Sequence, residues 1–485
     1  MISKSFLKSS LVFTIGGALP MVASIILLPF YANYLGDVNY AKILFYILIS
    51  SLFQILFSFS TENYFGIKYS QLFEDKEKQK RFIGTVSVLL LSIGGGLTLL
   101  SLLFGDIVFK AFSRDDLIIE FWPYGFYSIL TGFFNSYFKT ATICLIYSKQ
   151  SRLFLYGNII NFFATVIISV GGLLLFPGTI IGPIYGRLLS GVIIFIIGHY
   201  IFLKNGTITF DMSFLKDLRS FCVPYLLYAI CGWILAGSDR YILLEFGIEI
   251  KNLNAYDLLL KCFFGIEFLQ NSLSAVIFPR LYDIWAKNKD KRTTTESNRY
   301  FNVFTAINIF QLILFCIFIP IVYKIFIQNE TFYESERYIG ILAAGYALRS
   351  ILNFYLATIL FTKNIGVIFK VFLLCTVFQL IFTVIAAKYY GLDGVIYVGL
   401  ATKILQIGLC MWLTKPIFKY EFNYFKIIGV PFIYIGVNLI QFLVYKEYNL
   451  ILYILQLLVF SAIFYFLFKN EIKKVMVSFK LIKDN

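Results

Sequence analysis

The chain has 485 residues, of which 59% are apolar, 19% are aromatic and only 14% are charged. A soluble domain carries about 25% charged residues, so this composition excludes a soluble globular protein, and its apolar richness excludes a disordered one. The formal net charge is +15, but the sequence offers no soluble basic domain that could hold a nucleic acid. The composition therefore predicts a polytopic membrane protein.

Long apolar runs follow one another along the chain and predict transmembrane helices. A spanning helix needs about 20 mostly apolar residues. The runs are too long and too continuous for barrel strands of about 10 alternating residues, and the first is too long for a cleavable signal peptide. We expect fourteen spans, at 11–33, 41–62, 82–104, 121–147, 153–176, 179–203, 221–245, 254–279, 301–327, 338–362, 365–387, 393–414, 426–445 and 450–468.

The Lys and Arg residues between the spans predict the orientation of the chain. With the N-terminus in the cytoplasm, the inner segments carry 27 Lys and Arg residues and the outer segments carry seven. Because cytoplasmic loops are enriched in these residues, we expect both termini to face the cytoplasm. The outer loops are short, and no inner loop is long enough to hold a folded catalytic domain.

Cysteine and histidine usage argues against several kinds of site. The seven cysteines all lie inside apolar runs without paired spacing, so the pattern indicates neither a disulfide framework nor a zinc site. The one histidine, His199, does not indicate histidine-based catalysis. We therefore predict a protein that is not an enzyme, with no catalytic residue, no metal site and no bound cofactor.

Eight Lys and Arg residues fall inside the apolar runs, where a charge that faces lipid is costly. Each costs roughly 2.5–3.5 kcal/mol at a helix centre, and eight would cost on the order of 20 kcal/mol, more than the net stability of a typical fold. Lys324 and Lys370 lie near helix ends and can reach the interface. The others must face a polar interior or a partner, and they are Lys139, Arg187, Arg240, Lys261, Arg349 and Lys403.

Acidic residues inside the spans are fewer, and they are Asp239, Asp257 and Glu267. Asp257 and Lys261 stand four residues apart on one helical face, so an ion pair and a ligand-binding role are both open. Asp239 and Arg240 are adjacent, and we expect them to point in different directions rather than to pair. The excess of cations predicts a basic, water-filled cavity and an anionic substrate, for which a phosphate or pyrophosphate is the obvious candidate.

Polar residues accompany these cations at helical spacing, as in Tyr346, Arg349 and Asn353. Hydroxyls and amides beside cations suit a sugar, and hydrogen bonds between helices are the alternative interpretation. Prolines such as Pro20 and Pro224 interrupt the first and seventh spans. Broken helices at matching positions in two halves are typical of transporters.

Three segments of the chain are similar to motifs of a known family. They are LPFYANYLGDVNYAKILF at 28–45, GSDRYILLEFG at 237–247 and IFPRL at 277–281. With them the chain resembles the lipid-linked oligosaccharide flippases, which form the polysaccharide-biosynthesis branch of the MATE-like MOP superfamily. This superfamily also holds the multidrug MATE exporters. One departure is Asn254-Ala255-Tyr256, where the family usually has Gly-x-Tyr.

The resemblance implies an all-α fold of two six-helix lobes around a central cavity, with two extra C-terminal helices. The N-lobe would occupy 1–220 and the C-lobe 221–420, and the last two spans and a cytoplasmic tail would occupy 421–485. It also implies a substrate: a short sugar repeat on undecaprenyl pyrophosphate. This substrate would move from the cytoplasmic to the periplasmic leaflet of the bacterial inner membrane by alternating access.

In this interpretation the six cations bind the pyrophosphate and any acidic sugars. Coupling to a proton or sodium gradient is an open question, with Asp239 and Glu267 as the candidate coupling acids. The expected partners are the lipid bilayer and the polysaccharide polymerase machinery. The O-antigen of lipopolysaccharide and capsule both remain open as the glycan.

Two other functions remain open. A MATE-type drug or cation antiporter of the same architecture would need an acidic cavity, whereas the sequence has an excess of cations. A membrane oligosaccharide polymerase or ligase would need a large outer loop for its chemistry, and the outer loops are short.

Overall fold

The computed structural model describes residues 4–72, 74–287, 294, 296–362 and 364–478, and nearly all of these are helical. The end of the predicted cytoplasmic tail, after 478, lies outside the described residues, as does part of the basic segment 281–300. The chain forms two compact units, unit 1 at Met1–Trp233 and unit 2 at Ile234–Asn485. The division into 1–220, 221–420 and 421–485 stays a prediction.

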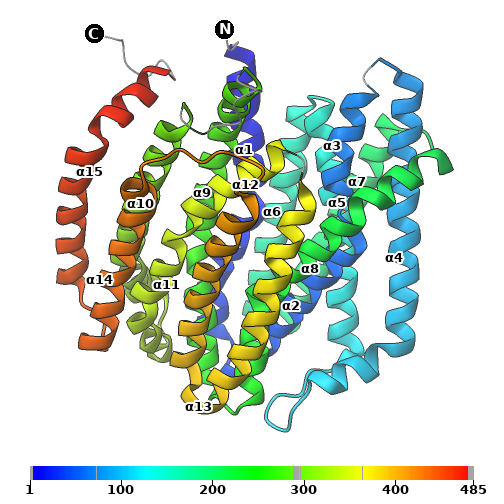
Figure 1. Ribbon diagram of the computed structural model, residues 1–485. Coiled ribbons are helices and arrows are strands. Elements are labelled where there is room, and N and C mark those ends of the chain that lie inside the picture. Colours follow the sequence, from blue (N-terminus) through cyan, green and yellow to red (C-terminus); the bar gives the residue numbers. More distant parts are fainter. Residues whose placement is uncertain (1–3, 73, 288–293, 295, 363, 479–485) are drawn as a thin grey trace. The chain divides into compact units, whose positions relative to one another are not determined.

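Unit 1 consists of long helices joined by short turns (Figure 1). Within it, α6 packs against α7 and α1, and α5 packs against α7 and α2. The elements are α1 (Lys4–Tyr34), α2 (Asp37–Ser58), α3 (Thr61–Gln71), α4 (Lys76–Phe112), η1 (Phe121–Gly125), α5 (Phe126–Tyr147), α6 (Ser151–Leu175), α7 (Ile181–Asn205), η2 (Met212–Phe214) and the first part of α8 (Leu215–Glu245).

Small residues allow α6 and α7 to approach each other closely. A Cβ atom added at Gly172 would lie 2.5 Å from the Cα of Gly182, and one added at Gly182 would clash with the backbone of Gly172 and Leu173. A Cβ atom at Gly186 would clash with Ser169. Lipid is as apolar as the helices themselves, so close packing of small residues is what joins them.

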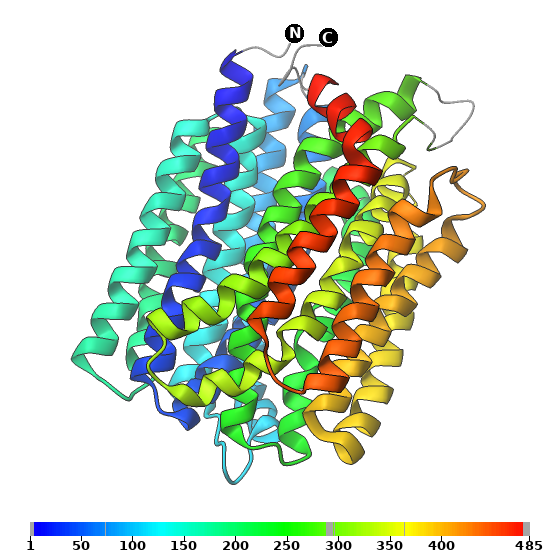
Figure 2. The same ribbon diagram turned by 90° about the vertical axis from the view of Figure 1, so that its left-hand side faces the viewer.

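Unit 2 begins within α8 and ends with the C-terminal helix pair. Figure 2 shows α15 (red) running back in the opposite direction after α14 (orange), and α10 packs against α15 while α11 packs against α14. The elements are α9 (Ile250–Lys287), α10 (Asn298–Phe326), η3 (Glu330–Tyr338), α11 (Ile339–Ala347), α12 (Arg349–Phe361), α13 (Ile365–Thr414), η4 (Phe425–Gly429), α14 (Val430–Tyr445) and α15 (Leu450–Ser478).

The 50 residues of α13 form two helical limbs that meet at Gly391. Gly391 has φ 58° and ψ −142°, a conformation that is strained for any residue with a Cβ atom. The chain reverses there, and the two limbs run back alongside each other (Figure 1). A straight helix of this length would measure about 75 Å, more than twice the roughly 30 Å of a bilayer core. The limbs therefore correspond to the predicted spans 365–387 and 393–414.

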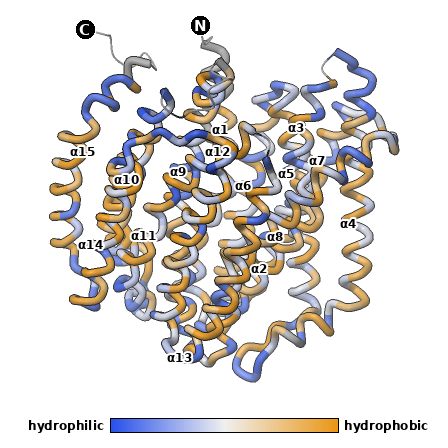
Figure 3. The backbone as a smooth tube through the Cα atoms, in the orientation of Figure 1, coloured by the Kyte–Doolittle hydropathy of each residue, from blue (hydrophilic) through white to orange (hydrophobic). Residues whose placement is uncertain are grey.

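In the described part of the chain, 13 helical stretches are long and apolar enough to cross a membrane. One of them, Gly366–Thr414, contains both limbs of α13, which accounts for the fourteenth predicted span. Figure 3 shows the expected pattern on α15, which is hydrophobic along most of its length and hydrophilic towards its C-terminal end. The predicted all-α, multi-pass membrane fold is confirmed.

The predicted interruptions at prolines are wrong. Helix α1 runs continuously through Pro20, and α8 runs continuously through Pro224. Membrane helices tolerate proline because neighbouring groups satisfy the backbone atoms that it leaves unpaired. A discontinuity occurs instead between α11, which ends at Ala347, and α12, which begins at Arg349.

Candidate functional site

The six predicted cations are distributed over both units. Unit 1 holds Lys139 on α5 and Arg187 on α7. Unit 2 holds the other four, which are Arg240 on α8, Lys261 on α9, Arg349 on α12 and Lys403 on the second limb of α13.

A buried ion network joins α8 to α9 in unit 2. Arg240 is only 3% exposed, and it donates from Nε to Asp257 Oδ1 and from Nη1 to Asp239 Oδ1, both at 3.0 Å. Lys261 Nζ lies 2.5 Å from Asp257 Oδ2. The Tyr256 hydroxyl donates to Asp239 Oδ2 at 2.7 Å. Charges at such depth persist only when they are paired and hydrogen-bonded, and this network meets that condition.

The expectation that Asp239 and Arg240 do not pair is wrong. The Arg240 side chain folds back along α8, where Nη1 also bonds the carbonyl oxygen of Ala236, one turn earlier. An arginine is long enough to reach its own neighbour in this way, which the directions of the two Cβ atoms alone do not reveal. The predicted alternative of an ion pair between Asp257 and Lys261 is observed.

Polar side chains support the junction between α11 and α12. Asn308 on α10 donates from Nδ2 to the carbonyl oxygens of Tyr346, at 3.3 Å, and Ala347, at 3.2 Å. Gln270 on α9 in turn donates to Asn308 Oδ1. Backbone groups at a helix end need such partners because lipid supplies none.

Arg349 extends from this junction towards α9. Its Nη1 lies 2.5 Å from Glu267 Oε1, and its Nη2 donates to Asn271 Oδ1 at 3.3 Å. One turn further along α12, Asn353 donates to Ser274 Oγ at 3.3 Å. The side chains of Arg349 and Glu267 are 25% and 33% exposed. This pair therefore remains accessible, in contrast to the buried ion network.

Lys403 lies over an aromatic ring instead of beside a carboxylate. Its Nζ is 4.4 Å from the ring centroid of Tyr346, which stacks on Phe263 with a centroid distance of 5.1 Å. Gly345 makes room for it, because a Cβ atom there would lie 2.8 Å from Lys403 Nζ. None of the ion pairs among the described residues involves Lys403. A cation that lies over a ring face and has no ion pair in the described chain is available to bind an anion.

In unit 1, Lys139 has a carboxylate partner that was not predicted from the sequence. Its Nζ lies 2.9 Å from Oε1 of Glu62 on α3. Glu62 is the last residue of the predicted span 41–62, and this position is the signal that could have identified it as an acid at membrane depth. The excess of cations is therefore smaller than predicted.

Arg187 lines a small hollow between α2, α5 and α7. The polar residues around this hollow are Tyr46, Ser50, Ser128 and Thr131. No ion pair of Arg187 occurs within the part of the chain that the structure describes. The polar residues that line the hollow with Arg187 carry hydroxyl groups, whereas the other arginines of the set have carboxylate partners.

The predicted cations therefore fall into two groups. Arg240, Lys261, Arg349 and Lys139 are each paired with a carboxylate, whereas Arg187 and Lys403 have none among the described residues. The structure brings Tyr346, Arg349, Glu267 and Lys403 together within unit 2. Substrate binding by the six cations stays a prediction.

No protein-family profile and no curated protein matches the chain. Solved structures do match it. Lipid II flippase MurJ, in an inward closed conformation, has a TM-score of 0.66 at 16% identity, covering 94% of this chain and 99% of that chain. An inward-facing multidrug resistance MATE family transporter of the MOP superfamily has a TM-score of 0.65 at 16% identity, covering 83% and 94%.

A third match is the MATE multidrug transporter DinF-BH. Its TM-score is 0.62 at 12% identity, and the match covers 86% of this chain and 96% of that chain. At these identities the likeness establishes the fold. The chain is a multi-pass membrane protein with the fold that MurJ and the MATE transporters share.

Proposed function

We propose that the chain is a flippase for undecaprenyl-pyrophosphate-linked oligosaccharides. It moves repeat units from the cytoplasmic to the periplasmic leaflet of a bacterial inner membrane, with both of its termini in the cytoplasm. The observation on which the proposal depends is Lys403, a cation at membrane depth that lies over Tyr346 without a carboxylate partner in the described chain. It is supported by the fold, for which the match to the lipid II flippase covers 94% of this chain.

The pyrophosphate binds where Arg349 and Lys403 meet. The guanidinium of Arg349 presents two parallel donors to a phosphate, and the ammonium of Lys403 supplies a point charge. Because Arg349 is held by Glu267 in the free protein, the phosphate replaces the carboxylate of Glu267 as its partner. Alternating access then exposes the bound headgroup first to one side of the membrane and then to the other.

Glu267 links this exchange to an ion gradient. Once the phosphate has displaced it from Arg349, the carboxylate is free to take up a proton or a sodium ion. Asp239 is the second candidate coupling acid, and it lies in the buried ion network beside Arg240 and Tyr256. Its release requires a rearrangement of that network, so Glu267 is the more accessible of the two.

A MATE-type drug antiporter is the alternative, because the TM-scores of MurJ and the MATE transporter are almost equal. Two observations favour the flippase. The MATE matches cover less of this chain, 83% and 86% against 94%. Four of the acids within the predicted spans, Glu62, Asp239, Asp257 and Glu267, already contact a Lys or Arg residue. These acids are therefore not free to bind a cationic drug.

The test is a translocation assay on purified protein in proteoliposomes that contain undecaprenyl-pyrophosphate-linked oligosaccharide. Flipping is read from the accessibility of the sugar to a membrane-impermeant oxidant. We expect flipping by the wild type and at least a tenfold loss in Lys403→Ala and in Arg349→Ala. The matched control is Lys388→Ala, an exposed lysine of the same helix, which should retain the wild-type rate.

Other outcomes identify the rival functions. Efflux of a cationic dye without any flipping would indicate an antiporter. Formation of a glycosidic bond by the purified protein alone would indicate an enzyme.

A further inference from the structure

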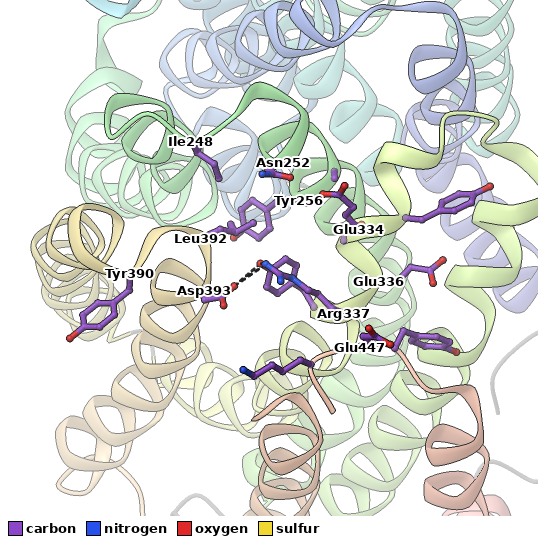
Figure 4. A pocket seen from close by; sticks show the side chains of 16 residues that line it. Ile248, Asn252, Tyr256, Glu334, Glu336, Arg337, Tyr390, Leu392, Asp393 and Glu447 are labelled. Atoms are coloured by element: carbon purple, nitrogen blue, oxygen red, sulfur yellow. Dashed lines mark hydrogen bonds and ion pairs between the residues drawn. The ribbon is translucent and has the colours of Figure 1, made fainter. Parts of the chain in front are cut away.

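A polar cavity of about 890 Å³ opens at one end of unit 2 (Figure 4). The turns between α8 and α9, before α11, at the corner of α13 and between α14 and α15 all contribute to it, and every lining residue belongs to unit 2. Its volume lies within the range of about 300–1,000 Å³ that is typical of ligand sites. None of the cations proposed to bind the pyrophosphate lines it.

Tyrosine rings form much of the lining, and the protein holds them rigidly. Four of the rings have hydroxyl groups that donate to a carboxylate or a backbone carbonyl of unit 2 at distances between 2.6 and 3.0 Å. They belong to Tyr256, Tyr333, Tyr338 and Tyr448. Tyr256 and Tyr338 are buried, at 4% and 2% exposure, so the apolar surfaces open to a ligand are those of the partly exposed Tyr333 and Tyr448. A surface that is already fixed loses little entropy on binding.

Carboxylates supply the polar part of the cavity. Glu334, Glu336 and Glu447 all line it. Oε1 of Glu336 is buried and has no hydrogen-bond partner in the described chain. Figure 4 shows Arg337 reaching Asp393 across the cavity, with Nη2 and Oδ1 3.3 Å apart. Three carboxylates thus remain as acceptors of hydrogen bonds from a ligand.

The arrangement suits a saccharide. Sugar hydroxyls donate to carboxylates, and the apolar faces of sugar rings pack on aromatic rings. A divalent cation is less well suited, because no group of three or more acidic, histidine or cysteine side chains in the described residues is arranged to hold a metal. The lining carries four carboxylates against the cations Arg337 and Lys446, and this net negative charge favours neutral or amino-bearing sugars and disfavours uronic acids.

We infer that this cavity binds the sugar portion of the transported molecule at the outer end of unit 2. The inference rests on the proposed function and on the predicted orientation, in which this end faces the periplasm. Tyr256 joins the cavity to the buried ion network, since its ring lines the cavity and its hydroxyl donates to Asp239. This buried ring therefore lies between the cavity and a candidate coupling acid.

The experiment measures binding of soluble tetrasaccharides to the full chain in lipid nanodiscs by isothermal titration calorimetry. The probes are tetraglucosamine, maltotetraose and tetragalacturonate. We expect the first two to bind saturably and the third to bind at least tenfold more weakly. The Glu334→Gln, Glu447→Gln double variant should lose at least tenfold in affinity for tetraglucosamine. The control Glu330→Gln, which changes an exposed acid of the same short helix outside the cavity, should stay within twofold.

Three results would overturn the inference: no saturable binding of any probe, unchanged affinity in the double variant, or binding that disappears when a chelator removes divalent cations. The melting temperature of the double variant, whose two substitutions are exposed, serves as the test of folding. Flipping by the wild type without any saccharide binding would overturn this site and leave the proposed function standing. Saccharide binding without flipping would overturn the proposed function alone.

Discussion

The partner of a charged side chain at membrane depth determines what that side chain can do. Arg240 is held by two carboxylates in a buried network, and its energetic role is to keep α8 and α9 together. Lys403 has an aromatic face in place of a carboxylate. Arg349 lies between these cases, because its carboxylate partner is partly exposed and can be exchanged. The three residues look equivalent in the sequence, but their surroundings give them different chemistry.

The position of Lys403 can be tested without removing its charge. In Gly345→Ala, the new Cβ atom would lie 2.8 Å from Lys403 Nζ and must displace it from the ring of Tyr346. We expect the flipping rate to fall several-fold while the protein still inserts. Gly399→Ala is the control, because an added Cβ atom there meets nothing within 4 Å. Equal rates in the two variants would contradict the role of Lys403.

The buried ion network predicts a loss of stability in Asp257→Asn. This change removes the carboxylate shared by Arg240 and Lys261, and breaking a buried pair costs about 3–5 kcal/mol. The melting temperature of the purified protein should therefore fall clearly. Glu249→Gln, which removes an exposed pair with Lys251, should change stability by less than about 1 kcal/mol. Similar melting temperatures for the two variants would show that the network does not stabilise unit 2.

At the scale of the helices, discontinuities and close contacts do more than length to define the fold. The apolar runs predict where helices lie, because lipid requires each backbone group to bond within its own helix. They do not predict that α11 and α12 meet at a supported junction, since Asn308 reaches it from a different helix. They also do not predict that Pro20 lies inside an unbroken helix.

The contact between α6 and α7 predicts that Gly182→Ala destabilises unit 1. The added Cβ atom would clash with backbone atoms of α6, and backbone cannot move aside as a flexible side chain can. Overpacking of this kind typically costs about 1–3 kcal/mol. Thermal unfolding in detergent measures the effect. Gly171→Ala is the matched control on α6, where an added Cβ atom meets nothing within 4 Å, and it should melt like the wild type.

At the scale of the molecule, the sequence was sufficient for the membrane class and the number of spans. Hydropathy and charge bias are properties of whole segments, so they can be read from the sequence without knowledge of the tertiary contacts. The site was only partly predictable. The sequence identified Lys403 and Arg349, but the pairing of Lys139 with Glu62 joins residues 77 positions apart and depends on how α3 packs against α5. The cavity of unit 2 is lined from four separate turns, and no local pattern marks it.

The predicted topology can be tested with reporters fused at defined positions. A reporter after Lys204 should be active in the cytoplasm, and one inserted after Lys446, beside the cavity of unit 2, should be active in the periplasm. The physical reason is that cytoplasmic segments retain their Lys and Arg residues. A periplasmic signal after Lys204 would contradict the span count, and a cytoplasmic signal after Lys446 would place the cavity on the wrong side for sugar release.

The corner at Gly391 has a consequence for how the protein enters the bilayer. The two limbs of α13 are separated by one non-helical residue, so almost no polar chain has to cross to the far side of the membrane between them. A connection this short keeps the joined ends of both limbs on the same side of the membrane. The two limbs can therefore enter the bilayer together as a hairpin, and residues added at the corner would separate two helices that a single glycine now joins.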